Sequence, residues 1–271
     1  MLKFREKNYI VCLLDTCVIS DFYEDSSIYQ NFLEMLIQEN ILIAISISTT
    51  LELKKVSERY EWFKNEFTKL PAFLIKPTDL LLRDELDKYP YENNEKFLLE
   101  YLFEKKELLD FLDKSEKFQN AVQYVEKDKT NVLNSILSLK ENFPPDSNGK
   151  YSTSRINEFL ERVTSQQLET FFPDWTAKFK PTTKMDFSKF KSLRSQLLIA
   201  FWKFYLMKDR KAKKSDIFDI TIVSALPYVD IVITEKNMKN DIDQIRNKGL
   251  FFHNLKAMTI NEIKKPAPNK L

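Results

Sequence analysis

Acidic residues stand at four points along the chain where a predicted strand passes into a predicted helix. They are Asp15 after YIVCLL, Glu52 after ILIAISISTTL, Asp216 and Asp219 in SDIFDITIV, and Glu235 after VDIVIT. Carboxylate oxygens are the ligands that hard cations such as Mg²⁺ prefer. Carboxylates gathered at one place repel one another unless a cation lies between them. The pattern therefore predicts a site for Mg²⁺ or Mn²⁺, and such a metal favours hydrolysis of phosphodiester bonds by activated water.

The predicted elements bring these acids to one edge of a sheet. Short apolar, β-prone runs at residues 9–14, 41–47, 72–75 and 229–234 are typical of buried strands, and 250–253 is a candidate for a last one. Helical signals follow at 27–38, from 49, at 216–226 (stopped by Pro227) and from 236. Alternating strands and helices predict right-handed βαβ units and a parallel sheet, whose carboxyl edge is where ligands bind.

The middle of the chain has a different pattern of apolar residues. Residues 78–207 show helical periodicity and little strand signal, with a loop at 144–149, a helix opened by Ser152, a break at 172–175 and a long apolar helix over 187–208. We expect the aromatic side chains here to form core rather than a binding platform. The predicted organisation is an α/β domain of residues 1–77 and 208–265, an all-helical insertion of 78–207, and a tail of 266–271.

The insertion enters near the acidic edge, so we expect it to shape substrate access or to form an interface with a second subunit. The alternative is a stabilising cap that does not contact substrate.

A run of positive charge joins the insertion to the second half of the α/β domain. The net charge of the chain is only +2, but KDRKAKK carries five cations in seven residues. Such a run fits contacts to a nucleic-acid backbone, and it also fits a solvated loop. The candidate nucleic-acid-binding residues are Lys208, Arg210, Lys211, Lys213 and Lys214.

Several classes of protein are disfavoured by composition. With two glycines in 271 residues, the chain has no glycine-rich phosphate loop. The only cysteines, Cys12 and Cys17, have neither disulfide-framework nor zinc-ligand spacing, which indicates a reduced, cytoplasmic protein. No apolar run is long enough to cross a bilayer, and the N-terminus lacks a signal-peptide cleavage site, so no membrane partner is expected.

Each acid also has a purely structural interpretation. Asp15 could cap the turn after its strand, and Glu52 could close a capping box with the Thr49 amide. The two aspartates of SDIFDITIV could lie at the positive end of a helix dipole. Thr234 and Glu235 could begin the next helix. Convergence on one edge favours the metal site over four separate caps.

Four segments carry a family resemblance. LLDTCVI, STTLEL, DITIVSAL and VITEKNM together resemble the four-part signature of PIN-domain nucleases, over residues 8–77 and 212–262. The resemblance implies a three-layer α/β fold with a parallel sheet, here interrupted by the helical insertion. It also implies a metal-dependent endonuclease, most often a ribonuclease, and the family includes toxins of toxin–antitoxin pairs.

The resemblance assigns the acids one by one. The first acid of the family falls on Asp15 and the second on Glu52. The third falls on Asp219, with Asp216 as the competing choice. The fourth is usually Asp and here is Glu235, one methylene longer. These five residues are the expected ligands of one or two Mg²⁺ or Mn²⁺ ions, about 4 Å apart if there are two.

Nearby polar residues divide into supporting and unrelated ones. Thr16 and Thr234 match hydroxyl positions that support the site in the family. Asp230 belongs at the far end of its strand and is left out of the metal site. His253, the only histidine, is expected to be a surface or packing residue, so no histidine base is required.

RNA is the expected partner by family association, and a homodimer and an inhibitory protein partner are further expectations of that association. One alternative is a non-catalytic PIN-like module that binds RNA or protein, which Glu235 in place of Asp favours. Others are a structure-specific or defence nuclease acting on DNA, and a metal-binding phosphatase.

Overall fold

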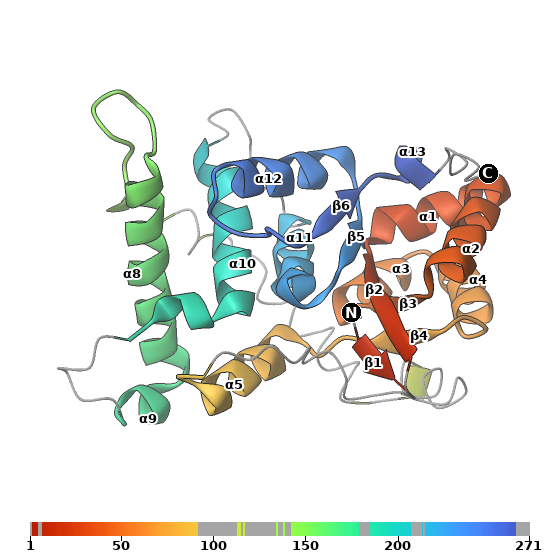
Figure 1. The fold of residues 1–271 in the computed structure, drawn as a ribbon, viewed down its shortest axis with the longest axis horizontal. Coiled ribbons are helices and arrows are strands. Elements are labelled where there is room, and N and C mark those ends of the chain that lie inside the picture. The colour runs from red at the N-terminus through yellow and green to blue at the C-terminus, as the bar shows by residue number, and fades with distance from the viewer. Residues whose placement is uncertain are drawn as a thin grey trace.

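The structure is a computed structural model that describes residues 2–4, 7–91, 142–178, 185–206, 213 and 215–263, with residues 113, 114, 116, 134 and 138 as isolated positions. The chain forms an α/β fold in which helices cover both faces of one sheet (Figure 1). The tail of 266–271 lies outside the described residues.

Five parallel strands make up the sheet, as predicted. In the order in which they pair, they are β4 (Ala72–Leu74), β3 (Ile41–Ile45), β2 (Lys7–Leu14), β5 (Ile231–Ile233) and β6 (Lys256–Met258). A short strand β1 (Leu2–Phe4) pairs with the start of β2 in antiparallel orientation. The central strand β2 is therefore flanked by β3, which follows it closely in sequence, and by β5, which lies more than 200 residues later.

Alternate side chains of β2 enter two different cores. Val11 and Leu13 pack with the helices of one face, whereas Cys12 and Leu14 pack with those of the other. All four are fully buried. Burial on both faces explains why the strand is a continuous apolar run rather than an alternating one.

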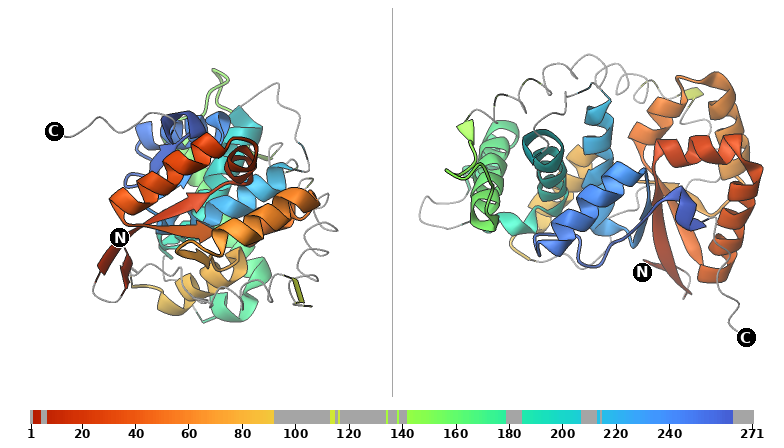
Figure 2. Two further views of the ribbon diagram at one scale, coloured as in Figure 1. Left: turned by 90° about the vertical axis from the view of Figure 1, so that its right-hand side faces the viewer. Right: turned by 90° about the horizontal axis from the view of Figure 1, so that it is seen from above.

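The helices of the first face come from the N-terminal third of the chain. They are α1 (Thr16–Glu24), α2 (Ser26–Glu39), α3 (Ile47–Leu53) and α4 (Ser57–Phe67), with α13 (Ile260–Ile263) near the C-terminus. Figure 2 shows α1 on the face of the sheet opposite to α10.

The second face is covered by helices from the insertion and from the C-terminal part together. They are α5 (Thr78–Lys88), α8 (Thr153–Phe171), α9 (Pro173–Thr176), η1 (Phe187–Lys189), α10 (Lys191–Phe201), η2 (Trp202–Leu206), α11 (Asp216–Ile222), η3 (Val223–Tyr228) and α12 (Lys236–Asn247). Helix α10 packs against α5, η3 and α12, and α8 lies beyond α10 in an outer layer (Figures 1 and 2).

The described part of the insertion shares its apolar core with the sheet. Phe159 of α8 and Phe201 of α10 belong to the same buried cluster as Val11 and Leu13 of the central strand. The Phe159 and Phe201 ring centroids are 5.0 Å apart. These aromatic side chains are core, as predicted, so these helices are bound into the domain by apolar burial.

Three predicted elements differ in detail from the observed ones. Residues 250–253 are not a strand, because Gly249 and Phe252 have positive φ angles (68° and 61°) that end any extended run, and the last strand is β6. The apolar helix predicted from residue 187 begins at Lys191 after a separate turn of 3₁₀ helix and widens into the π-turn η2. Pro227 lies inside the 3₁₀ segment η3 instead of stopping a helix.

No helix within the described ranges has the length and apolarity needed to cross a lipid bilayer.

Candidate active site

The acidic edge lies at the carboxyl end of the central strand β2, where the order in which strands join the sheet reverses. From the central β2 the chain adds β3 and β4 on one side, and later β5 and β6 on the other. Leu14 at the end of β2 pairs with Ile233 at the end of β5. The Asp15 amide continues this ladder by donating to the Ile233 carbonyl at 3.1 Å. Such a switch point is the usual position of a binding crevice in an open α/β sheet.

Asp15 is the centre of the acidic group. Its Oδ1 accepts a hydrogen bond from the Thr16 amide at 2.7 Å and thereby caps α1. Its Oδ2 accepts a hydrogen bond from the Thr234 hydroxyl at 2.6 Å, which ties the end of β2 to the end of β5. The carboxylate is thus held from both sides and is only 9% exposed. Asp15 therefore caps α1, as its structural interpretation suggested, while its second carboxylate oxygen bonds Thr234 across the sheet edge.

Glu52 turns toward Asp15 instead of capping its own helix. Thr16 donates its hydroxyl hydrogen to Glu52 Oε2 at 2.6 Å. The capping box expected at Thr49 is wrong, because α3 begins earlier and its cap is Ser46, whose Oγ accepts from the Thr49 amide at 3.0 Å. Thr16 therefore links the first and second acids, Asp15 through its backbone amide and Glu52 through its hydroxyl.

Asp216 and Asp219 lie in the first turn of α11, as predicted, and they meet a lysine that sequence reasoning missed. Lys203 of the π-turn η2 donates to Asp219 Oδ2, and its Nζ is 4.0 Å from Asp216 Oδ1. Its side chain is 0% exposed. The signal was a single lysine in the apolar run LLIAFWKFYLM, which a buried ion pair explains.

Glu235 is the N-cap residue of α12, and its exposed side chain forms no capping hydrogen bond. Thr234 donates to Asp15 instead of capping α12. The structural interpretation of Thr234 and Glu235 as the start of a helix is therefore only half correct. Glu235 occupies the N-cap position of α12, but its side chain does not cap the helix.

Electrostatics join the acids into one group. The pKa of Asp15 is raised, first by burial and then by the charges of Asp219 and Glu235, against the lowering effect of its hydrogen bonds from Thr234 and Thr16. The pKa of Glu52 is raised by burial first, and by the charges of Asp15 and Asp219, while the Thr16 hydrogen bond and Lys55 lower it. Neighbouring negative charges therefore make ionisation of Asp15 and Glu52 harder, as expected of acids that lie near other carboxylates.

Cys17, next to this group, does not supply a thiolate. Its pKa is raised by burial and by the charges of Asp15, Glu235 and Asp21. Both cysteines are free, so neither disulfide nor metal–thiolate chemistry is indicated.

The acids fit Mg²⁺ or Mn²⁺ in type. All are oxygen donors, and a cation near Asp15 and Glu52 would offset the repulsion that helps to raise the pKa of these two carboxylates. As the side chains lie, the described residues contain no group of three or more Asp, Glu, His or Cys side chains arranged to hold one metal ion. Metal binding would therefore require rotation of some of these carboxylates.

The remaining predicted residues lie elsewhere. Asp230 is at the opposite end of β5, as expected, where its Oδ2 accepts from the Val11 amide at 2.9 Å. His253 is exposed in a turn. Of the basic run, the structure describes only Lys213, which is exposed and whose amide donates to Asp216 Oδ2 at 2.8 Å. Lys208, Arg210, Lys211 and Lys214 lie outside the described residues.

Another buried carboxylate, not anticipated from the sequence, lies under the other face of the sheet. Glu85 of α5 accepts hydrogen bonds from the Ser192 amide and hydroxyl, both at 2.7 Å, and from the Tyr228 hydroxyl. Burial raises the pKa of Glu85 to about 7, although these three donors favour the ionised form. The network joins α5, α10 and η3, and none of the acids of the sheet edge takes part in it.

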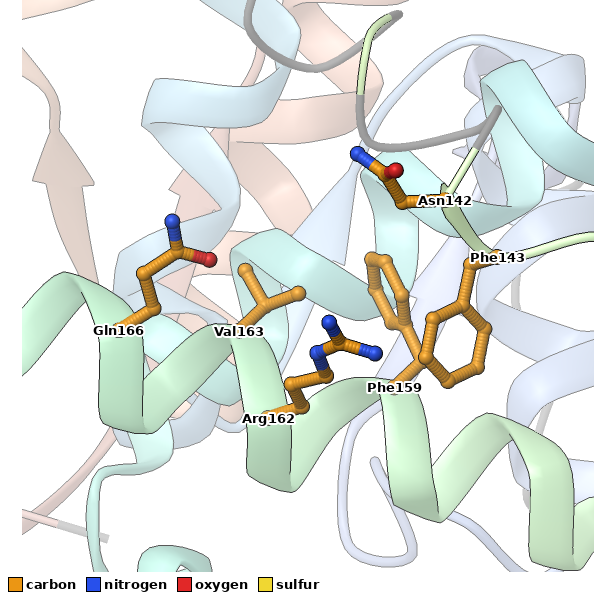
Figure 3. Close-up of a pocket in the computed structure, with 6 residues that line it drawn as sticks. All are labelled: Asn142, Phe143, Phe159, Arg162, Val163 and Gln166. Atoms are coloured by element: carbon orange, nitrogen blue, oxygen red, sulfur yellow. The ribbon is translucent and has the colours of Figure 1, made fainter.

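A pocket of about 190 Å³ opens on the outer layer of the insertion (Figure 3). It is lined by Asn142, Phe143, Phe159, Arg162, Val163 and Gln166. None of the predicted site residues lines it, and α8 is separated from the acidic edge by α10 (Figure 1).

No protein-family model, curated protein or solved structure matches this chain. The functional assignment therefore rests on the resemblance of the four motifs and on the side chains described above.

Proposed function

We propose that the chain is a metal-dependent endonuclease that hydrolyses phosphodiester bonds, with RNA as its substrate. The observation that carries this proposal is that Thr16 joins Asp15 to Glu52 at the switch point of a parallel sheet, with Asp219 in the first turn of α11 near enough for its charge to raise the pKa of both. Such a group favours a cation, and its carboxylate and hydroxyl oxygens are hard ligands that suit Mg²⁺ or Mn²⁺.

In this proposal Asp15, Glu52, Asp219 and Glu235 hold the metal, and Asp216 supports Asp219 through their common lysine. A bound Mg²⁺ or Mn²⁺ would lower the pKa of a water molecule and stabilise the charge on the phosphate. The protein contributes position: Thr234 and the Thr16 amide fix Asp15, and the Thr16 hydroxyl fixes Glu52. RNA is chosen over DNA on the family resemblance. The two free cysteines favour a reducing cytoplasmic setting.

The proposal is tested by cleavage of end-labelled single-stranded RNA and DNA with Mg²⁺, Mn²⁺ or EDTA. We expect the wild type to cut RNA only with metal, and Asp15→Asn to lose this activity while keeping its fold. Asn can still accept from the Thr16 amide and hydrogen-bond the Thr234 hydroxyl. Asp230→Asn is the matched control, because it removes the same charge at the opposite end of β5 and should remain active. Full activity of Asp15→Asn would refute the assignment, and preferential cutting of DNA would correct the substrate.

A non-catalytic RNA- or protein-binding module is the second candidate. The observation that favours it is the ion pair between Lys203 and Asp219, which gives one of the acids a protein cation in place of a metal. Under this alternative the wild type neither cuts RNA nor binds Mn²⁺, but it still binds single-stranded RNA or a protein.

A further inference from the structure

Lys203 carries a positive charge into the interior at the acidic edge. Its side chain is 0% exposed, and its flanking residues Trp202, Phe204 and Tyr205 are also buried. Removing an ammonium group from water costs several kcal/mol unless opposite charges compensate it. Asp219 and Asp216 supply those charges, at hydrogen-bond contact and at 4.0 Å. The lysine is consequently a fixed part of the site and is too deeply buried to contact an RNA backbone.

The local helix geometry at Lys203 supports a dedicated role. Helix α10 changes at Trp202 from α-helical to π-helical hydrogen bonding, and Lys203 is the second residue of that π-turn. π-turns are rare and occur frequently at functional sites, because their extra residue redirects side chains. Here Lys203 meets α11, whose first turn carries the two aspartates. A helix of the insertion thus contributes a residue to the acidic edge.

Lys203 divides the acids into two halves. Asp216 and Asp219 share its ammonium group. Asp15, by contrast, accepts hydrogen bonds from the Thr234 hydroxyl and the Thr16 amide, and Glu52 accepts one from the Thr16 hydroxyl, all of them neutral donors. The half that contains Asp15 is therefore the half that still calls for a cation.

We propose that Lys203 takes the place of a second divalent metal ion, so that the site binds a single Mg²⁺ or Mn²⁺ on the side of Asp15 and Glu52. This inference rests on the proposed function, because it concerns the metal of that site. The ammonium group supplies one permanent positive charge between Asp216 and Asp219, which also keeps the metal-free site from being disrupted by repulsion. Asp219 contacts Lys203 directly and would be shared between the ammonium group and the metal ion.

The test is the number of Mn²⁺ ions bound per chain, measured by equilibrium dialysis with elemental analysis. We expect one ion in the wild type and two in Lys203→Met, because the variant leaves Asp216 and Asp219 without their internal cation. Lys203→Arg keeps the charge and should stay at one. Lys213→Met is the matched control: it removes an exposed lysine beside Asp216 whose amide, not its ammonium group, is the donor to that carboxylate. It should also bind one ion.

Thermal unfolding supplies a readout that is independent of activity. Lys203→Met should be less stable than the wild type in EDTA and should recover more of its stability as Mn²⁺ is added, because ions that bind only the folded state stabilise it. If Lys203→Met does not fold at any Mn²⁺ concentration, the numbers of Mn²⁺ ions bound by the wild type and by Lys203→Arg decide whether the site holds one metal ion or two.

Each result has a definite meaning. Two Mn²⁺ ions in the wild type, or one in a folded Lys203→Met, would overturn the role of Lys203 and leave the proposed nuclease standing. No Mn²⁺ in the wild type, together with no cleavage, would overturn the proposed function itself.

Discussion

The buried carboxylate of Glu85 makes a quantitative prediction about stability and pH. Burial raises its pKa from 4.5 to about 7 in the folded protein, so the folded state binds a proton more tightly than the unfolded state does. The stabilisation is complete below pH 4.5 and is lost as pH rises to about 7. Each pH unit corresponds to about 1.4 kcal/mol, so Glu85 should lower the free energy of unfolding by about 3 kcal/mol across this range. At 5% exposure, solvent screening reduces this figure little.

Glu85→Gln is the matched perturbation. The amide oxygen can accept from the Ser192 amide and Tyr228, and the amide nitrogen can donate to the Ser192 hydroxyl, which is free to rotate. Urea unfolding of wild type and variant is followed from pH 4.5 to 8 in EDTA, so that metal binding does not contribute. The difference between the two free energies of unfolding should shift by about 3 kcal/mol in favour of the variant as pH rises.

The test uses the difference in free energy of unfolding between the wild type and Glu85→Gln. The raised pKa values of Asp15 and Glu52 also make the wild type less stable as pH rises, and this effect is common to both proteins. Glu161→Gln, at an exposed position of α8, controls for the loss of one negative charge and should track the wild type. A difference between wild type and Glu85→Gln that is constant with pH would refute the reasoning. It would mean that the three hydrogen-bond donors outweigh burial and keep Glu85 ionised throughout.

Two further predictions concern the hydroxyl groups at the acidic edge. Thr16→Val and Glu52→Gln remove the two ends of one half-buried hydrogen bond. In a double-mutant cycle they should therefore show a coupling of about 1 kcal/mol in the free energy of unfolding. Additive effects of the two substitutions would show that the contact contributes nothing to stability. Ser46→Ala should lower the free energy of unfolding by about 1 kcal/mol, because it removes the cap of α3. Thr49→Val retains the capped amide and should lower the free energy of unfolding by less. A larger loss of stability in Thr49→Val than in Ser46→Ala would support the capping box at Thr49 instead.

The parallel sheet and the position of its acids could be predicted because both depend on strong local signals. Each buried strand is a short apolar run, and Asp15 and Glu235 directly follow two of the predicted runs. In a parallel sheet this spacing is enough to bring Asp15 and Glu235 to the same edge. The order of the strands required only that β5 return beside β2, which the right-handed crossover rule allows.

What the sequence did not reveal depends on distant partners. Lys203 and Glu85 each look like ordinary charged residues of a helical region, and their partners are 13 to 143 positions away. Ser46 and Thr49 are both good caps, and the choice between them depends on where the preceding strand ends. Residues 250–253 have a composition typical of a strand, but the positive φ angles that follow α12 prevent an extended backbone there.

The pairing of β2 with β5 has a consequence for the synthesis of the protein. The Asp15 carboxylate and the Thr234 hydroxyl that orients it are 219 positions apart, and Lys203 and the α11 aspartates are also made late. During translation the first three parallel strands emerge with their helices, while the edge of β2 that should receive β5 stays open. The two halves of the acidic edge can meet only when most of the chain has left the ribosome. A partly made chain has Asp15 and Glu52 but lacks Thr234, Lys203 and the α11 aspartates. If the proposed ribonuclease function holds, such a chain should have no activity toward the RNA from which it is being read.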